Sequence, residues 1–135
     1  MDVFRAEMAF VGGLDMVRAF GMASRDLVAR VWPERDKLAD DLELCLIEGL
    51  SNVFFHAHNR DAHKIIRFEI IGQEKQLIVR VYDSGKGFVF ESDKVELPDF
   101  QSENGRGLYI ISQLMDSVSY HSSSKMNYLE MIKNL

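Results

Sequence analysis

The sequence predicts an α+β fold, in which helices pack on one face of a mixed, mostly antiparallel sheet. Two observations carry this prediction. Apolar residues recur at helical spacing in the first half of the chain, and strand-like runs joined by polar turns dominate the second half. The 135 residues, of which 47% are apolar and 27% charged, are expected to form a single domain, 1–135, with a core of ordinary size.

The first half is expected to hold a short strand and two helices. Residues 7–11 can form the strand, which two glycines end. An amphipathic helix then runs up to Trp32, where Pro33 is placed to break it and to start another. The second helix is expected from Glu34 to about His58. Its apolar face is traced by Leu38, Leu42, Leu46, Leu50 and Val53.

The second half is expected to contain two hairpins separated by a loop and a helix. Residues 65–71 and 77–82 predict an antiparallel pair around the polar turn 72–75. From Ser84 to Gly105 the chain loses its periodicity, and a loop of that length in a compact domain usually serves a function. The remaining elements are a helix at 108–115 and strands at 118–121 and 128–132.

The composition disfavours several classes of protein. The net charge of −5 argues against direct binding to nucleic acid, which requires a basic surface. No apolar run approaches the ~18 residues that span a bilayer, and no signal peptide is evident. The single cysteine, Cys45, cannot form an internal disulfide and fits a reducing compartment. These features predict a cytoplasmic protein with no membrane segment.

The second predicted helix carries a carboxylate and a carboxamide on one face, at Glu48 and Asn52. Residues four apart stack along a helix, and Cys45 and His56 extend the same stripe. Asn52 Oδ1 can ligate Mg²⁺, a hard ion that takes oxygen ligands, and Glu48 can accept a proton from an attacking hydroxyl. Taken alone, the pair also fits an ordinary solvated helix face, because such pairs occur by chance in most helices.

An acid followed by two alternating glycines ends the strand predicted at 77–82. Asp83 follows the apolar run directly, and Gly85 and Gly87 come next. The carboxylate can accept a hydrogen bond from an exocyclic amine such as that of adenine, while the glycines let the base lie against the backbone. An ordinary turn is the alternative interpretation of this motif by itself.

A glycine turn, Asn104-Gly105-Arg106-Gly107-Leu108, precedes the last predicted helix. Backbone amides at a helix start attract anions, and the planar guanidinium of Arg106 can pair with a phosphate. The dinucleotide-binding fingerprint is not matched, because Ile110 occupies its third glycine position, and the P-loop and ordinary protein-kinase signatures are missing. The three motifs, in this order, predict one nucleotide pocket.

Together these residues resemble the Bergerat (GHKL) ATP-binding fold of gyrase, MutL-type proteins and histidine-kinase catalytic domains. Within that superfamily the chain is similar to the small stand-alone anti-sigma-factor serine kinases, from about residue 6 to the C-terminus. The most specific stretch is Ile47-Glu48-Gly49-Leu50-Ser51-Asn52-Val53-Phe54-Phe55-His56-Ala57, with glutamate, asparagine and histidine in the family's order. Residues 81–88 and 105–110 follow, and Leu114-Met115-Asp116 stands where the family often has the same triplet.

The resemblance implies a role for each motif. Glu48 would activate the serine hydroxyl of a protein substrate, and Asn52 would hold Mg²⁺ between the phosphates of ATP. Asp83 would read adenine, residues 88–104 would form the ATP lid, and Arg106 would help to hold phosphate. The implied nucleotide-binding set is Asn52, His56, Asp83, Gly85, Gly87, Asn104, Gly105, Arg106, Gly107 and Leu108.

The resemblance also implies partners. The substrate would be a small anti-anti-sigma protein of the STAS type in a partner-switching regulatory system. The kinase would also bind a sigma factor, and such kinases often form homodimers.

Two departures from the family's pattern are visible. The family commonly has a threonine at the start of the final strand, where it helps to line the nucleotide site. This chain has Ser124-Lys125-Met126-Asn127 there, and Ser124 or Asn127 could substitute. The lid is also unusually acidic for a segment beside a triphosphate, with Glu91, Asp93, Glu96, Asp99 and Glu103.

Other functional readings of the sequence are weaker. His56, His58 and His63 suggest a metal site, but no further spacing of His, Cys or carboxylate completes the tetrahedral set that Zn²⁺ prefers. His56 is better explained as part of the nucleotide stripe. Cys45 is interpreted as a small buried residue and not as a nucleophile.

Two alternative functions remain beside the serine kinase. One is an ATP-gated binding module, or a switch kinase, that sequesters or activates a sigma factor or a phosphatase without significant catalysis. The other is a detached histidine-kinase catalytic domain. The sequence disfavours the second, because no helical dimerisation segment with a phospho-accepting histidine precedes the fold.

Overall fold

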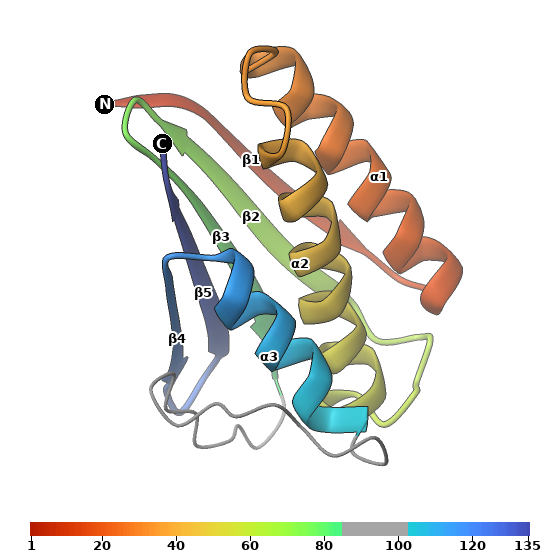
Figure 1. Cartoon of the computed structure of the whole chain (residues 1–135). Helices are drawn as coiled ribbons and strands as arrows, with labels where there is room; N and C mark the ends of the chain where they lie inside the picture. The colour runs from red at the N-terminus through yellow and green to blue at the C-terminus, as the bar shows by residue number, and fades with distance from the viewer. Residues whose placement is uncertain (85–102) are drawn as a thin grey trace.

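The structure, a computed structural model, describes residues 1–84 and 103–135, with the backbone alone at 103–105. In chain order its elements are β1 (Asp2–Phe10), α1 (Leu14–Val31), α2 (Leu38–Asn52), the π-helical turn η1 (Val53–Ala57), β2 (Ile66–Gln73), β3 (Gln76–Asp83), α3 (Glu103–Leu114), β4 (Ser117–Ser122) and β5 (Asn127–Asn134) (Figure 1).

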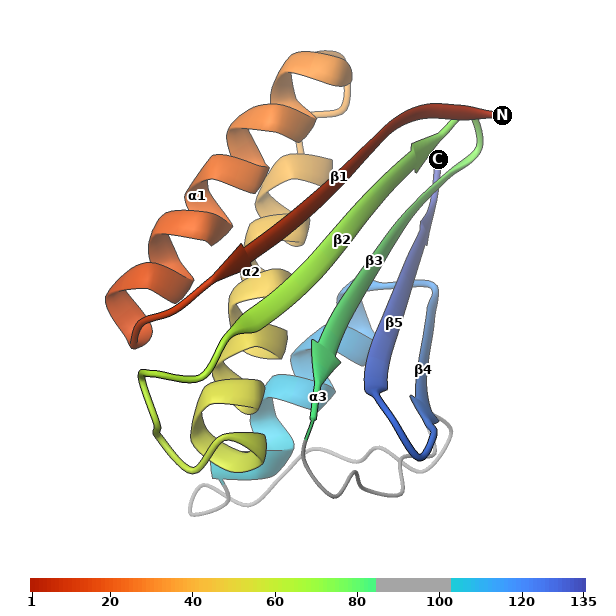
Figure 2. The ribbon, with the colours of Figure 1, turned by 180° about the vertical axis from the view of Figure 1, so that it is seen from behind.

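The strands form one sheet in the order β1-β2-β3-β5-β4, and each pairing is antiparallel. The helices α1, α2 and α3 lie on one face of this sheet (Figure 1). Seen from behind, the opposite face has no described helix over it (Figure 2). The prediction of a two-layer α+β fold is therefore confirmed, with an antiparallel rather than a mixed sheet in the described part of the chain.

The core lies between the two layers. Side chains alternate between the faces of a strand, so Phe68, Val79 and Met131 point toward the helices. Fully burying such a side chain contributes roughly 1.5–3 kcal/mol, which makes this layer the main source of stability. The buried core includes Val17, Val28, Leu42, Leu46, Leu50, Phe68, Ile70, Val79, Ile111 and Met131.

The helices α1 and α2 approach each other closely at Gly21. A Cβ atom at this position would lie 2.5 Å from Ile47 Cγ1, so the absent side chain sets the separation of the helices. Arg25 pairs across the same interface with Asp40 at 2.7 Å and with Glu43 at 3.1 Å. These pairs are largely exposed, where solvent screens their attraction, so apolar packing decides how the helices dock.

Two boundaries in the first half differ from those predicted. β1 begins at Asp2 instead of residue 7, because alternating polar residues place one of its faces toward solvent while its whole length pairs with β2. α2 begins at Leu38 instead of Glu34. The chain makes successive turns after Pro33 before the helix starts, and these turns use the residues that were expected to form its first turn.

Two helical features also differ from prediction. α3 begins at Glu103, so Gly105 and Gly107 lie in its first turns instead of in a turn before it. The helix that carries Glu48 passes from α2 into η1 (Val53–Ala57), where the hydrogen bonds span one residue more than in an α-helix. Apolar periodicity gives no sign of such a change, which alters the direction of the side chains after Asn52.

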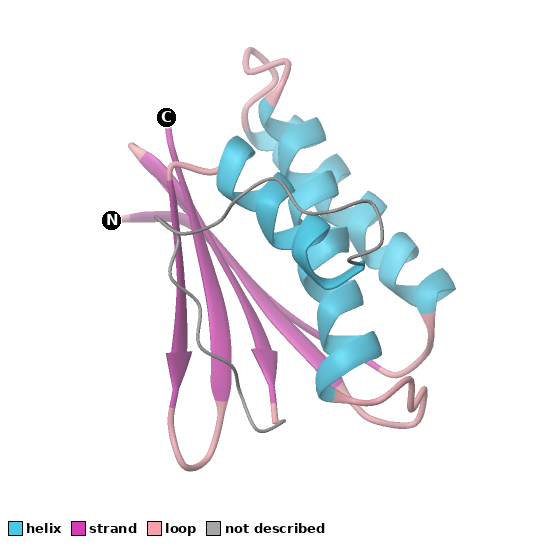
Figure 3. Ribbon diagram, turned by 60° about the horizontal axis from the view of Figure 1, so that its bottom comes forward, coloured by secondary structure: helices cyan, strands magenta, loops and turns pink. Residues whose placement is uncertain are grey.

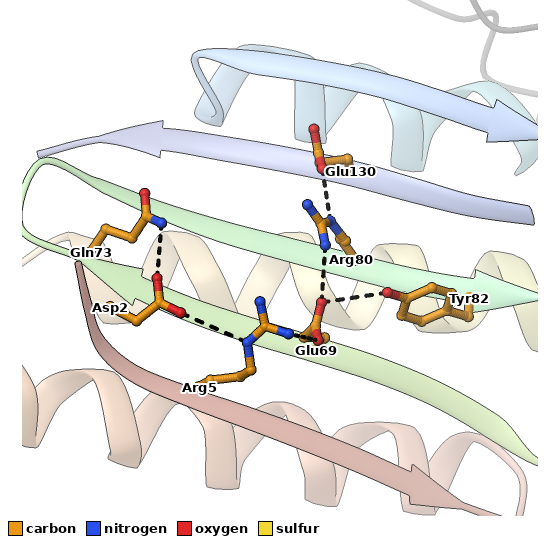
Figure 4. A network of polar contacts seen from close by, with 7 residues as sticks. All are labelled: Asp2, Arg5, Glu69, Gln73, Arg80, Tyr82 and Glu130. Atoms are coloured by element: carbon orange, nitrogen blue, oxygen red, sulfur yellow. Dashed lines mark hydrogen bonds and ion pairs between the residues drawn. The ribbon is translucent and has the colours of Figure 1, made fainter.

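The face of the sheet away from the helices carries a polar network centred on Glu69 (Figure 4). Glu69 is only 5% exposed and accepts hydrogen bonds from Arg5 at 3.2 Å, Arg80 at 3.3 Å and Tyr82 at 3.4 Å. Arg80 also pairs with Glu130 at 2.8 Å. The network therefore links β1, β2, β3 and β5 side by side.

Among the helices of the described residues, none is both long enough and apolar enough to span a bilayer.

Candidate functional site

The three sequence motifs meet at one end of the molecule. The end of α2, the start of α3, the end of β3 and the β4–β5 turn all lie there (Figures 1 and 3). Each motif stands at or near the terminus of its helix or strand. Because the strands are antiparallel and the helices run along them, these termini meet at the same end of the molecule. The fold thus gathers segments that lie far apart in the sequence.

Glu48 and Asn52 lie on the face of α2 that meets α3. Gly49, beside them, packs on the sheet, where its Cβ would be 3.3 Å from Val81 Cγ2. Gly107 of α3 is buried, and a Cβ there would lie 2.8 Å from Glu48 Oε2 and 3.5 Å from Asn52 Nδ2. The first turns of α3 therefore approach the carboxylate and the amide to within contact distance, which only glycine allows without displacing Glu48.

The surroundings of Glu48 change its acidity. Partial burial raises the pKa of Glu48 above its ordinary value, because burial disfavours the charged carboxylate. The guanidinium of Arg106, which is exposed at the start of α3, opposes this shift and lowers the pKa. A carboxylate with a raised pKa is a better proton acceptor at neutral pH than an ordinary surface glutamate.

Asp83 ends β3 as a buried carboxylate, 7% exposed, with both oxygens engaged. Tyr120 donates a hydrogen bond to Oδ2 at 2.8 Å, and Asn127 Nδ2 donates one to Oδ1 at 3.0 Å. Ser122 in turn donates to Asn127 Oδ1 at 2.7 Å. The register explains this contact, because Asp83, Asn127 and Ser122 stand opposite one another on β3, β5 and β4.

This network bears on the missing threonine. Asn127 and Ser124 are the two residues that could take the place of the family's threonine. Asn127 is buried and hydrogen-bonded to Asp83, whereas Ser124 is exposed in the β4–β5 turn. Tyr120 was not anticipated from the sequence. Its position on β4, two strands away from Asp83, becomes meaningful only once the strand order is known.

His58 is a second buried polar residue close to Asp83 that the sequence motifs did not indicate. It is 2% exposed, and within the described chain its Nδ1 has no hydrogen-bond partner. Burial lowers the pKa of His58, the charge of Lys64 lowers it further, and the carboxylate of Asp83 partly opposes the shift. The π-helical turn just before His58 helps to set its position, which periodicity alone could not reveal.

The other predicted site residues are distributed as follows. His56 is exposed beside Phe55, because the π-helical turn interrupts the stripe that Asn52 begins. Leu108 is partly buried against the core, and Asn104 and Gly105 lie in the first turn of α3. Gly85, Gly87 and residues 88–102 of the predicted lid (88–104) lie outside the described residues, and residues 103–104 belong to α3.

Cys45 is fully buried, which matches its interpretation as a packing residue. Burial is the main reason that its pKa is raised to about 12, with smaller contributions from Asp41 and Glu48. Its thiol therefore stays protonated and unreactive at neutral pH. In the ranges 1–84 and 103–135, no group of three His, Cys, Asp or Glu residues is arranged to hold a metal ion.

The residues present fit an adenine nucleotide. Asp83 is an oriented acceptor for an amine, Gly107 allows close approach at the start of a helix, and Asn52 supplies an amide oxygen beside it. Nδ1 of His58, which is buried and has no hydrogen-bond partner among residues 1–84 and 103–135, adds a polar atom near Asp83. A base would thus meet the end of β3, and phosphates would meet the start of α3.

The chain is similar in sequence to known protein kinases. The chain is 33% identical over 96 residues to the serine-protein kinase RsbW of Bacillus velezensis, and 32% identical over 96 residues to that of Staphylococcus aureus (strain JH9). These alignments cover 63% of this chain and 58% and 59% of the relatives, so the chain spans less than two thirds of their length.

A solved structure and a family model extend the comparison. The structure titled as the SiaB–SiaC complex from Pseudomonas aeruginosa has the same fold, with a TM-score of 0.62 at 13% identity over 95% of this chain and 89% of that one. Residues 13–133 match the model of the histidine kinase-like ATPase domain, a range that includes α2, β3 and α3 with their motifs. Since this match covers the layers and the site together, the chain belongs to the histidine kinase-like ATPase domain family.

Proposed function

We propose that the chain is an ATP-dependent protein serine kinase and anti-sigma factor, with residues 1–135 acting as one cytoplasmic domain. The observation that carries the catalytic part is Glu48. It is partly buried, has a raised pKa and lies against Gly107 at the start of α3. A domain that only sensed nucleotide would need Asp83 and the helix start, but not this carboxylate.

The nucleotide would be held from two sides. Asp83 would accept a hydrogen bond from the adenine amine, and Gly85 and Gly87 would allow the base to approach the backbone. The first amides of α3, up to Arg106, would bind the phosphates together with the guanidinium of Arg106, while Asn104, Gly105, Gly107 and Leu108 would line the site. The amide oxygen of Asn52 would ligate Mg²⁺, and His56 would complete the edge of the site.

The metal–nucleotide complex would supply an electrophilic γ-phosphoryl group whose charge the ion neutralises. Glu48 would accept the proton of the substrate serine hydroxyl as it attacks. Its raised pKa suits this role, because a general base works best when its pKa approaches the working pH. Arg106 would stabilise negative charge on the phosphates and keep Glu48 ionised.

The proposed partners are those that the family resemblance implies. The resemblance to serine-protein kinases named RsbW supports a STAS-type anti-anti-sigma protein as the substrate and a sigma factor or phosphatase as the regulated target. The protein of shared fold was solved as a complex of SiaB with SiaC, which is consistent with a domain that binds a protein partner. A homodimer is the expected assembly.

The test is phosphate transfer from labelled ATP to a purified STAS-type candidate partner. Wild type should label a serine of the partner, and Glu48→Gln should lose about 10²-fold or more of kcat while still binding ATP. Glu43→Gln, on the same helix but paired with Arg25, is the matched control and should remain active. If Glu48→Gln keeps its signalling and its partner binding, the protein acts as an ATP-gated binding module instead.

A further inference from the structure

We propose that Tyr120 is a positioning residue that, with Asn127, fixes the carboxylate of Asp83 and makes the site selective for purines with a 6-amino group. The inference rests on the proposed nucleotide site and concerns how that site chooses its base. Nothing in the sequence motifs involves Tyr120, which lies on β4, two strands from Asp83.

The contacts define the orientation of the carboxylate. Tyr120 holds Oδ2 at 2.8 Å and Asn127 holds Oδ1 at 3.0 Å, so rotation about the last side-chain bond of Asp83 would break both hydrogen bonds. Asn127 is itself held by Ser122 at 2.7 Å. A carboxylate has about four acceptor positions, and these donors fix the direction in which they point.

The side chains involved all come from the helix-facing side of the sheet. Asp83 follows Val81 and Asn127 precedes Leu129, two core residues that face α2. Tyr120 pairs with Leu129 in the register of β4 and β5 and therefore points to the same side. The hydroxyl is thus built into the layer between sheet and helices, where a nucleotide base would lie.

The protonation state of Tyr120 is fixed as well. Burial and the hydrogen bond to Asp83 both raise the pKa of Tyr120 far above neutral pH, so its hydroxyl remains a donor. Tyr120 and Asn127 therefore hold the two oxygens of Asp83 in one orientation, which favours a base that presents an amine to them. A base that lacks the amine forgoes that hydrogen bond.

The test compares ATP with purine riboside triphosphate, which lacks the 6-amino group, by calorimetric titration of the full chain. Wild type should bind ATP about tenfold or more tightly than the analogue. Tyr120→Phe should weaken ATP binding by about three- to tenfold and leave the affinity for the analogue nearly unchanged, so that the preference shrinks. Tyr128→Phe should retain the wild-type preference, because Tyr128 stacks on His121 at the other face of the sheet.

The outcomes separate the two proposals. If wild type prefers ATP but Tyr120→Phe keeps the same preference, or loses both affinities equally, the positioning role is wrong while the nucleotide site stands. If wild type binds neither nucleotide, the proposed function fails and this inference fails with it. Thermal unfolding checks the fold of the variant. Should Tyr120→Phe not fold, Asn127→Ala removes the other donor and must reduce the preference in the same way.

Discussion

Two ionisable side chains near the site, Glu48 and His58, have pKa values displaced from their ordinary values by burial. Burial disfavours the charged form of each, so it raises the pKa of the acid and lowers that of the base. The consequences differ, because Glu48 is placed to handle a proton whereas His58 is buried in the fold. Their pH responses can therefore be measured separately, one through catalysis and one through stability.

The first prediction concerns the pH dependence of kcat. Glu48 must be ionised to accept a proton, so kcat should fall as the pH drops through its raised pKa. Because Arg106 lowers that pKa, Arg106→Gln should raise it and move the acid limb of the profile to higher pH. Arg106→Lys keeps the charge and should leave the limb near its wild-type position. Rates at saturating ATP check this, and an acid limb that stays fixed in Arg106→Gln would show that Glu48 is not the titrating base.

The second prediction concerns stability. The pKa of His58 is lowered in the folded protein, so at mildly acidic pH the unfolded chain binds a proton that the folded chain does not. The free energy of unfolding should therefore fall as the pH drops below about 6.5, the ordinary histidine value. It should level off below the lowered pKa. Urea titrations from pH 7.5 to 5.5 measure this.

The matched variants isolate the histidine responsible. His58→Phe should flatten the dependence of unfolding free energy on pH, whatever it does to the absolute stability. His63→Gln, at an exposed position, should leave the slope as in wild type. An unchanged slope in His58→Phe would assign the effect to another group.

At the scale of elements, two glycines let helices approach each other, and they serve different purposes. Gly21 brings α1 against Ile47 of α2, which is an apolar contact within the helical layer. Gly107 brings α3 against Glu48 and Asn52, which are polar and belong to the proposed site. An alanine substitution should therefore lower mainly kcat at Gly107 and mainly the free energy of unfolding at Gly21.

The third prediction is that Gly107→Ala damages catalysis more than stability. The new Cβ would lie 2.8 Å from Glu48 Oε2, so the carboxylate must move, and kcat should fall by about tenfold or more. Alanine is favoured over glycine in a helix by at most about 1 kcal/mol, and this gain should offset the cost of the new contact. The unfolding free energy should therefore stay near that of wild type.

Gly21→Ala is the comparison for this variant. Its Cβ would lie 2.5 Å from Ile47 Cγ1, so it should lower the unfolding free energy by about 1–3 kcal/mol and leave kcat unchanged. Equal effects of the two variants on kcat would contradict the assignment of Glu48 to catalysis.

At the scale of the whole molecule, the sheet separates two polar networks. The one around Asp83 lies on the side of the helices, whereas the one around Glu69 lies on the opposite face (Figure 4). The alternation of side chains along β2 and β3 keeps them apart. One network thus lies at the candidate site, and the other joins strands.

The fourth prediction follows from this separation. Glu69→Gln should lower the unfolding free energy by about 1–3 kcal/mol, because a buried acceptor of bonds from Arg5, Arg80 and Tyr82 loses its charge. Affinity for ATP should not change. Glu7→Gln, at the exposed cross-strand neighbour on β1, should have little effect on either quantity. A loss of ATP affinity in Glu69→Gln would mean that the two faces are coupled.

The sequence by itself determined the layers, the order of the elements and the three motifs, because these depend on local periodicity and on glycines and polar residues at the ends of elements. It did not predict the π-helical turn, of which apolar periodicity gives no sign, or the hydrogen bond between Tyr120 and Asp83, which depends on the strand order. Only the tertiary structure brought Gly107 against Glu48 and aligned Asn127 and Tyr120 with Asp83, because strand order and register decide which polar groups meet.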